Sequence, residues 1–474
     1  MEKLKICLVS VVQTSFWGSS AEEYKKKYIP EMKKLSEQLE FELLYIENPI
    51  GDIAGANNAK EQIDSMGADF LLIQLSTFAA GELLLPLAET GLRIGLWGVP
   101  EITGEGAIPN NSLCGVNMYG SILKQYLRRE NYKWFFGTVD DDLFLRRFKV
   151  TVSALTAIKR LKGAKVALIG GIAPGFYDFC YDERLALEKL GVKVNSLIEF
   201  GDIYARVLSY PEAEIKEEAA RMQAEYTCVG DNLEEEHLET STRVYRAFKE
   251  VLAEGGFDAA AISCWPKYRK NLGIVICSVI GRLLENGITA ACEGDVDSAI
   301  TMLLLKSLTG KQPMLMDLSK FDETDQTILM WHCGSAPKSY ADKDGVSLAM
   351  HYKPGSHVPG EDSKPAAAVN SMSFAAGPVT VARLTNDYKN MLLFSGEIME
   401  KADKSYDGSR GWIGGLHVEG EAIGIRELIN SVLSNGFQHH YAIVGGHVEN
   451  EMREIMAWLG IKPFAFLKYQ DYLQ

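Results

Sequence analysis

The sequence predicts two α/β domains with parallel sheets, followed by a third domain that is mostly antiparallel β. In the first two thirds of the chain, short apolar runs alternate with amphipathic segments, which is typical of buried strands and covering helices. Strand–helix alternation implies a parallel sheet with both faces covered. In the last third, short strands follow one another closely between Gly, Pro, Asp and Asn, which indicates an antiparallel sheet or barrel.

The first predicted domain, residues 1–163, contains five short apolar runs that we expect to be strands. These are residues 5–11, 41–46, 69–75, 93–99 and 134–137. Helical patterns occupy residues 21–39 and 59–66, and a long helix over 140–161 leads into the next domain. The alternation predicts a doubly wound, flavodoxin-like sheet.

The second predicted domain, residues 164–310, repeats this architecture without a detectable sequence repeat. We expect strands at 165–169, 193–200, 258–265 and 288–292, and helices at 181–190, 212–226, 241–253 and 271–285. The glycine-rich segment 170–176 lacks the G-x-G-x-x-G spacing of a dinucleotide loop, so it predicts a strand-to-helix turn without a nucleotide.

The third predicted domain, residues 311–474, is mostly a barrel-like antiparallel sheet. The expected strands are 327–332, 346–351, 379–384, 391–399 and 412–418, and the expected helices are 421–433 and 449–459.

Composition narrows the classes of function. The 474 residues carry a net charge of −14 and show no basic stripe, which argues against a nucleic-acid partner. No apolar run approaches the roughly 20 residues of a membrane span, and the first residues lack a signal-peptide core, so we expect a cytoplasmic protein. The eight cysteines are scattered singly, without a CxxC pair, which is typical of small core residues.

Four residues at the ends of apolar runs are candidates for chemistry. Glu293 follows the run 288–292, and Asp317 follows a second apolar run. His332 ends a predicted strand, and His440 begins one. Taken singly, each has an ordinary structural interpretation as a residue beside a helix cap, a turn residue or a structural histidine. Together, two carboxylates and two imidazoles suit a divalent metal and a pair of proton-transfer groups.

The motifs around these residues resemble the L-arabinose and L-fucose isomerase superfamily. The chain has Glu293-Gly-Asp, then Asp317 in Met-Asp-Leu, His332 in Trp-His-Cys-Gly, and His439-His440. Near the N-terminus, Gln13-Thr-Ser-Phe-Trp17-Gly and Thr77-Phe78 resemble two loops of the superfamily. Asp317 stands where arabinose isomerases have Glu and fucose isomerases have Asp, which puts arabinose in doubt as the substrate.

The resemblance implies that Glu293, Asp317 and His440 bind Mn²⁺, and that His332 completes the shell or contacts the sugar. The residue types themselves suit Mn²⁺ or Mg²⁺, with Co²⁺ also able to bind. We therefore predict an aldose–ketose isomerase that works through a cis-enediol, with Glu293 as principal base and Asp317 as its partner, or with these roles exchanged. A sugar-binding or sensing protein without turnover, and a metal-dependent aldolase or hydrolase, remain alternatives.

Several aromatic and polar residues are candidates for sugar contacts. Trp17, Phe78, Trp97 and Trp412 are candidates for stacking on a sugar, although core packing is equally open for Trp97. Arg410 is a candidate for holding an anionic substituent. The resemblance implies that Gln13, Trp17 and Thr77 close the site of a neighbouring subunit in a homo-oligomer, a trimer or hexamer. Pentose, hexose, deoxy and anionic sugars all remain open.

Overall fold

The computed structural model describes residues 2–13, 22–351, 366–401 and 406–474. The chain divides into two compact units, Met1–Lys159 and Arg160–Gln474. The finer division at residues 163 and 310 stays a prediction. Among the described residues, no helix is long and apolar enough to cross a membrane.

The first unit is built on a five-stranded parallel sheet of order β2-β1-β3-β4-β5. Its strands are β1 (Lys5–Val11), β2 (Glu42–Tyr45), β3 (Phe70–Leu75), β4 (Arg93–Gly98) and β5 (Lys133–Phe136). Its helices are α2 (Ile29–Gln38), α3 (Ile53–Met66), α4 (Leu84–Glu89), α5 (Ser112–Ser121) and α6 (Asp142–Leu161). The central strand β3 is buried along its whole length, as expected when helices cover both faces. The predicted strands are confirmed, whereas the doubly wound arrangement stays a prediction.

The second unit begins with a four-stranded parallel sheet of order β10-β9-β6-β7. Its strands are β6 (Lys165–Ile169), β7 (Lys193–Ile198), β9 (Ala259–Ile262) and β10 (Thr289–Cys292). Its helices are α7 (Glu183–Leu185), α8 (Phe200–Ser209), α9 (Glu212–Gln223), α10 (Glu235–Gly255), α11 (Lys267–Leu272), α12 (Cys277–Glu285) and α13 (Val296–Thr309). The single helix predicted over 271–285 is wrong. Gly273, with φ +69°, caps α11 in the left-handed region, and α12 starts after it.

Six strands of the second unit close into a barrel. They are β11 (Met314–Asp322), β12 (Thr327–His332), β15 (Gly377–Leu384), β16 (Asn390–Met399), β17 (Ser409–Val418) and β19 (His440–Gly445). Neighbouring pairs are antiparallel, and β16 pairs with both β15 and β17, which completes the ring. The predicted antiparallel β region is thereby confirmed. One detail of it is wrong: β11 continues to Asp322, so Asp317 lies within a strand and not at its end.

Further short strands and two helices complete the second unit. The strands are β8 (Cys228–Val229), β13 (Ser347–Met350), β14 (Ala367–Ser373), β18 (Glu421–Ala422) and β20 (Lys462–Pro463). The helices are α14 (Ile425–Ser434) and α15 (Glu449–Leu459). Ile425, Leu428 and Val432 of α14 belong to the same apolar core as the alternating barrel residues Met314, Met316, Ile328 and Met330.

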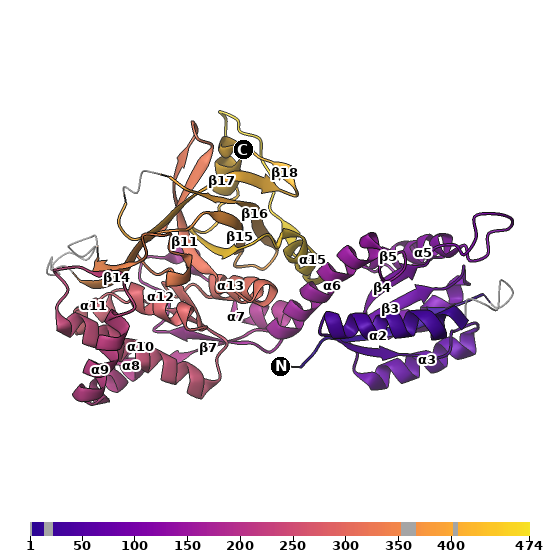
Figure 1. Cartoon of the computed structure of the whole chain (residues 1–474), viewed down its shortest axis with the longest axis horizontal. Helices are drawn as coiled ribbons and strands as arrows, with labels where there is room; N and C mark the ends of the chain where they lie inside the picture. The colour runs from indigo at the N-terminus through magenta and orange to yellow at the C-terminus, as the bar shows by residue number, and fades with distance from the viewer. Residues whose placement is uncertain (1, 14–21, 352–365, 402–405) are drawn as a thin grey trace. The chain divides into compact units, whose positions relative to one another are not determined.

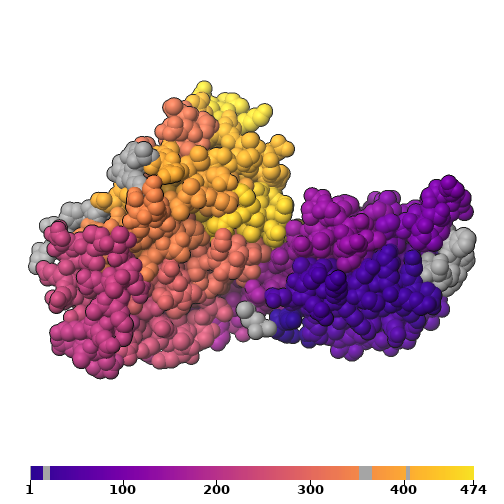
Figure 2. Space-filling view, viewed as in Figure 1, coloured from indigo at the N-terminus to yellow at the C-terminus, as the bar shows by residue number. Residues whose placement is uncertain are grey.

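Helix α13 joins the parallel sheet to the barrel. It contacts β6, β9 and β10 of the sheet and also β15 and β19 of the barrel, and it lies below the barrel strands in Figure 1. Its residues are buried around most of the circumference, as expected for a helix enclosed between two layers. The space-filling view shows the second unit, from the magenta helices to the yellow C-terminal segment, packed without a break on this face (Figure 2). The carboxyl end of β10 is thus held near the start of β19.

Candidate active site

Glu293 lies in a tight turn between β10 and α13. Its φ of +62° is in the left-handed region, which costs a non-glycine residue on the order of 1–3 kcal/mol. Three backbone hydrogen bonds hold the turn. Ala173 donates its N–H to the Glu293 carbonyl at 2.9 Å, Gly294 donates to the Ile262 carbonyl at 3.0 Å, and Asp295 donates to the Cys292 carbonyl at 3.1 Å. Asp295 then caps α13 by accepting the Ser298 N–H at 2.9 Å. The glycine-rich segment 170–176 therefore has a structural role as the support of this turn.

The other three predicted residues come from the barrel. Asp317 on β11 is paired directly with His440 at the start of β19, and His332 ends β12 on the other side of β11. The Nε2 atoms of His332 and His440 are 3.3 Å apart. His440 Nε2 is 3.5 Å from Asp317 Oδ1 and 3.6 Å from Glu293 Oε2. The structure therefore brings all four predicted residues together.

Two carboxylate oxygens of this cluster lack hydrogen-bond donors. Glu293 Oε2 and Asp317 Oδ1 are buried and accept no hydrogen bond from the described residues, although buried polar atoms are normally satisfied. Both are close to the same imidazole nitrogen of His440. Burial also raises the pKa of Asp317, against the opposing effect of His332 and His440. Oxygen and imidazole ligands around such unsatisfied atoms fit a hard divalent cation.

His440 is oriented by the carboxylate of Asp295. The Nδ1 of His440 is 3.2 Å from Asp295 Oδ2, and a proton donated along this bond leaves the Nε2 lone pair facing the cluster. Asp295 is itself balanced by the buried Arg383, whose Nη1 is 2.5 Å from the same oxygen. Burial favours the neutral acid, but Arg383 and His440 outweigh it and hold the pKa of Asp295 well below its usual range. In many proteins a carboxylate placed in this way positions a metal-ligating histidine, because it binds the ring nitrogen that does not face the metal.

His332 is oriented differently from His440. Its Nδ1 accepts the backbone N–H of Cys333 at 2.8 Å, so the neutral ring carries its proton on Nε2. That nitrogen faces the cluster and can donate a hydrogen bond. Glu293, His332 and His440 also lie close enough together to share a metal ion, so both roles left open for His332, metal ligation and contact with the sugar, stay predictions.

The structure adds residues that the sequence analysis did not select. His439 Nε2 is 3.5 Å from Glu293 Oε2, and its Nδ1 is 2.7 Å from Asp178 Oδ2. The Phe179 ring lies 4.5 Å from both His439 and His440. The His-His doublet and the isolated Arg383 in an apolar run were available signals, but nothing in the sequence marks Asp178.

The predicted sugar contacts of the first unit are partly described. The Gln13 N–H donates to Thr77 Oγ1 at 2.8 Å, which places these two loops side by side, with Phe78 next in the chain. Trp17 lies outside the described residues. Trp97 is fully buried, donates to the Gly137 carbonyl at 2.8 Å and packs on Phe144 at 4.8 Å. Of its two open interpretations, core packing is confirmed.

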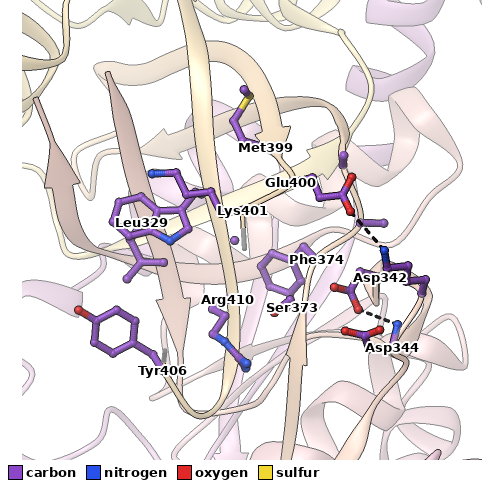
Figure 3. A pocket seen from close by; sticks show the side chains of 15 residues that line it. Leu329, Asp342, Asp344, Ser373, Phe374, Met399, Glu400, Lys401, Tyr406 and Arg410 are labelled. Atoms are coloured by element: carbon purple, nitrogen blue, oxygen red, sulfur yellow. Dashed lines mark hydrogen bonds and ion pairs between the residues drawn. The ribbon is translucent and has the colours of Figure 1, made fainter. Parts of the chain in front are cut away.

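Arg410 and Trp412, both on β17, line a cavity of about 690 Å³ (Figure 3). Leu329, Phe374, Tyr406 and three acidic residues also line it; the acidic residues are Asp342, Asp344 and Glu400. The Lys401 ammonium lies 4.0 Å from the centre of the Trp412 ring, so one of its stacking surfaces is engaged. The described lining includes none of the four clustered residues, and both sugar-contact roles stay predictions.

Comparison with curated proteins gives the class of protein: the chain is an aldose–ketose isomerase. Its relatives are named sulfoquinovose isomerase. The protein of Alkalicoccus urumqiensis is 27% identical over 395 residues, covering 82% of this chain and 84% of the relative. That of Priestia megaterium is 25% identical over 405 residues, covering 84% and 86%. That of Clostridium sp. is 26% identical over 367 residues, covering 75% and 77%.

No family model matches the sequence. A solute-binding protein from Agrobacterium vitis with bound tagatopyranose covers 65% of this chain and 90% of its own, at 12% identity. Its TM-score of 0.18 is too low to support a shared fold. Membership of the L-arabinose and L-fucose isomerase superfamily therefore stays a prediction.

Proposed function

We propose that this protein is a Mn²⁺-dependent isomerase that interconverts a sulfonated aldose and its ketose through a cis-enediol. The observation that carries the proposal is the cluster of two buried carboxylate oxygens without hydrogen-bond donors beside the Nε2 atom of His440. Glu293, Asp317 and His440 would hold the cation, which when bound polarises the carbonyl and stabilises negative charge on the sugar oxygens.

Glu293 and Asp317 supply the proton transfers. One carboxylate removes the proton from C2 of the aldose, and the C1 oxygen gains a proton as the enediol forms. The same carboxylate then returns a proton to C1, while the hydroxyl at C2 loses its proton and becomes the ketone. The strained turn at Glu293 fixes this carboxylate before the substrate arrives, which favours Glu293 for transfers at carbon.

His332 and Asp295 have two different supporting roles in the proposed reaction. The Nε2 proton of His332 faces the cluster and would donate to a substrate oxygen. Asp295 does not meet the sugar in this proposal, because its oxygens are already occupied by Arg383, Ser298 and His440. It acts as a positioning residue for His440.

The substrate class is taken from the relatives and from one residue of this chain. Sulfoquinovose, in the relatives' names, is a sugar that carries an anionic sulfonate. Arg410 is our candidate for binding such a group, since a guanidinium offers paired donors to anionic oxygens, although the described lining of its cavity includes none of the four clustered residues. Gln13, Trp17 and Thr77 would complete the site from a neighbouring subunit of a trimer or hexamer.

Deuterium exchange followed by NMR tests the proposal. The chelator-treated protein is mixed in D₂O with sulfoquinovose, glucose, L-fucose or L-arabinose, with and without Mn²⁺. We expect deuterium at C2 of the aldose and C1 of the ketose with sulfoquinovose, only after Mn²⁺ is added. Exchange into L-fucose but not into sulfoquinovose would overturn the proposed substrate class, whereas the proposed enediol isomerisation would still hold.

The same experiment separates the isomerase from a sugar-binding homologue. A protein that only binds would show broadening or shifts of sugar resonances without incorporation of deuterium. That result, obtained with Mn²⁺ demonstrably bound, would overturn the isomerase proposal. Exchange that persists unchanged in chelator would overturn the role of the metal.

A further inference from the structure

A second group of possible metal ligands lies outside the candidate active site. Cys277, Cys333 and His351 offer two sulfur atoms and one ring nitrogen, and these three atoms lie within 4.8 Å of one another. Cys277 is the first residue of α12, Cys333 follows β12, and His351 follows β13. The fold therefore gathers three residues whose sequence spacing matches no metal-binding motif.

The fold gathers these three side chains at one place. Their ligand atoms all lie within 4.8 Å of one another, although they come from three separate segments of the chain. Cys277 is 5% exposed, whereas Cys333 and His351 are half-buried. Ligands of one tetrahedral zinc lie roughly 3.5–4 Å apart for metal–ligand bonds of about 2.0–2.3 Å. Small side-chain rotations would bring the three atoms to that spacing.

We propose that Cys277, Cys333 and His351 form a site for a soft divalent cation, with Zn²⁺ as the best match. Thiolate and imidazole ligands select zinc, whereas the carboxylates of the neighbouring cluster suit Mn²⁺ or Mg²⁺. The chain would thus bind two ions of different character. This inference does not rest on the proposed isomerase activity, because its ligands and its test are separate.

The position of Cys333 connects this site to the candidate active site. Its backbone N–H donates to His332 Nδ1, the bond that sets the orientation of the His332 ring. A cation that holds the Cys333 side chain would therefore fix the strand end that carries His332. Occupancy would stabilise the protein and limit movement of this ring.

A second sulfur cluster provides a matched comparison within the same chain. Cys264 and Cys292 also approach each other, but their third neighbour is the carboxylate of Glu293 and not an imidazole. Binding there would occupy a residue of the candidate active site. The two clusters contain different cysteines, so substitutions can tell them apart.

Cobalt titration of the full-length, reduced and chelator-treated protein tests the site. Co²⁺ bound by thiolates gives an intense near-ultraviolet charge-transfer band, and Zn²⁺ should displace it. We expect one such ion per chain in the wild type, and loss of the band in C277S, C333S and H351A. Cys114→Ser, an exposed cysteine of the first unit, is the control that should keep the band.

Three results would overturn the proposal. One is the absence of a thiolate band in the wild type. Another is a band that survives in the C277S/C333S double variant but disappears in C264S/C292S, which would assign the ion to the other cluster. The third is a Cys277–Cys333 disulfide, found by peptide mass spectrometry of protein purified without reductant and alkylated at once.

X-ray absorption of the zinc-loaded wild type decides the matter if the variants fail to fold. The proposed site predicts two sulfur atoms and at least one imidazole nitrogen around zinc. A shell made only of oxygen and nitrogen would place the zinc with Glu293, Asp317 and His440, and would overturn the proposal without any substitution.

Discussion

Glu293 and Asp295 stand two residues apart in one turn, yet their carboxylates have opposite environments. Asp295 accepts hydrogen bonds from Ser298 and is in contact with Arg383 and His440. Glu293 Oε2 accepts no hydrogen bond from the described residues, and its backbone is in the left-handed region. One carboxylate is fully satisfied, whereas the other is held in strain with an unsatisfied oxygen.

This difference in environment suits the two carboxylates to different roles. A buried carboxylate with an arginine partner is fixed in its charged form and serves best to orient a neighbour. A buried carboxylate without donors is available to a cation or a substrate proton. We therefore propose that Glu293 makes the proton transfers at carbon and that Asp295 orients His440, and each substitution below tests one of these two roles.

The largest effect is expected from Glu293→Gln. Removal of the charged oxygen should lower kcat by roughly 10²–10⁴-fold, while the free energy of unfolding stays nearly unchanged because no hydrogen bond to Oε2 is lost. Single-turnover exchange in D₂O and urea unfolding measure the two quantities. Asp317→Asn is the matched variant: if it abolishes exchange at carbon and Glu293→Gln does not, the two carboxylates have exchanged roles.

Asp295→Asn should mainly affect stability. It leaves the buried guanidinium of Arg383 without its carboxylate, which typically costs about 3–5 kcal/mol, and it should weaken Mn²⁺ binding about 10–100-fold through His440. Urea unfolding and a metal titration check this. The D295N/R383M double variant should recover part of the stability, and strict additivity of the two single losses would contradict the pairing.

The low pKa of Asp295 also has a pH consequence. Its carboxylate stabilises the fold above the unfolded-state pKa near 3.9, and this stability is lost as pH falls below that value. Unfolding measured between pH 5 and pH 3 should therefore show a steeper loss in the wild type than in Asp295→Asn.

Gly294→Ala tests whether stability and turnover depend on the conformation of the turn that carries Glu293. A Cβ there would lie 2.4 Å from the Gly171 carbonyl oxygen and 2.8 Å from Ile172 Cα, at a φ of +78°. Strain and the clash together should cost roughly 2–4 kcal/mol and reduce turnover by moving Glu293. Gly310→Ala is the control, because it has φ +69° and open space around it, and should cost only about 1 kcal/mol. Equal losses in the two variants would mean that the close packing is unimportant.

The smallest effect concerns Asp297, the next carboxylate along α13. Burial raises its pKa to about 7, although Arg383 opposes this, and Tyr388 donates to it at 2.7 Å. A raised acid pKa means that stability is greatest below the unfolded value near 3.9 and falls as pH rises towards 7. Asp297→Asn should remove this fall and gain about 1–2 kcal/mol at pH 8. A wild-type stability that rises between pH 5 and pH 7 by as much as that of the variant would contradict this.

The sequence by itself determined most of the secondary structure and the identity of the four clustered residues. Apolar runs bounded by turn residues located β1, β3, β6, β10 and β12 because burial of a strand requires such a run. Glu293, Asp317, His332 and His440 were recognisable because each stands beside an apolar strand in a motif of known order. Where a single glycine divided α11 from α12, the apolar pattern continued across the break and concealed it.

Tertiary structure alone decided what surrounds those residues. Closure of the barrel through β16 and the position of α13 between two layers brought Arg383 to Asp295 and Asp178 to His439, across 88 and 261 residues of sequence. The same packing gathered Cys277, Cys333 and His351, whose spacing carries no motif. Local patterns report the burial of a segment, but which distant side chains satisfy one another depends on how the buried segments pack.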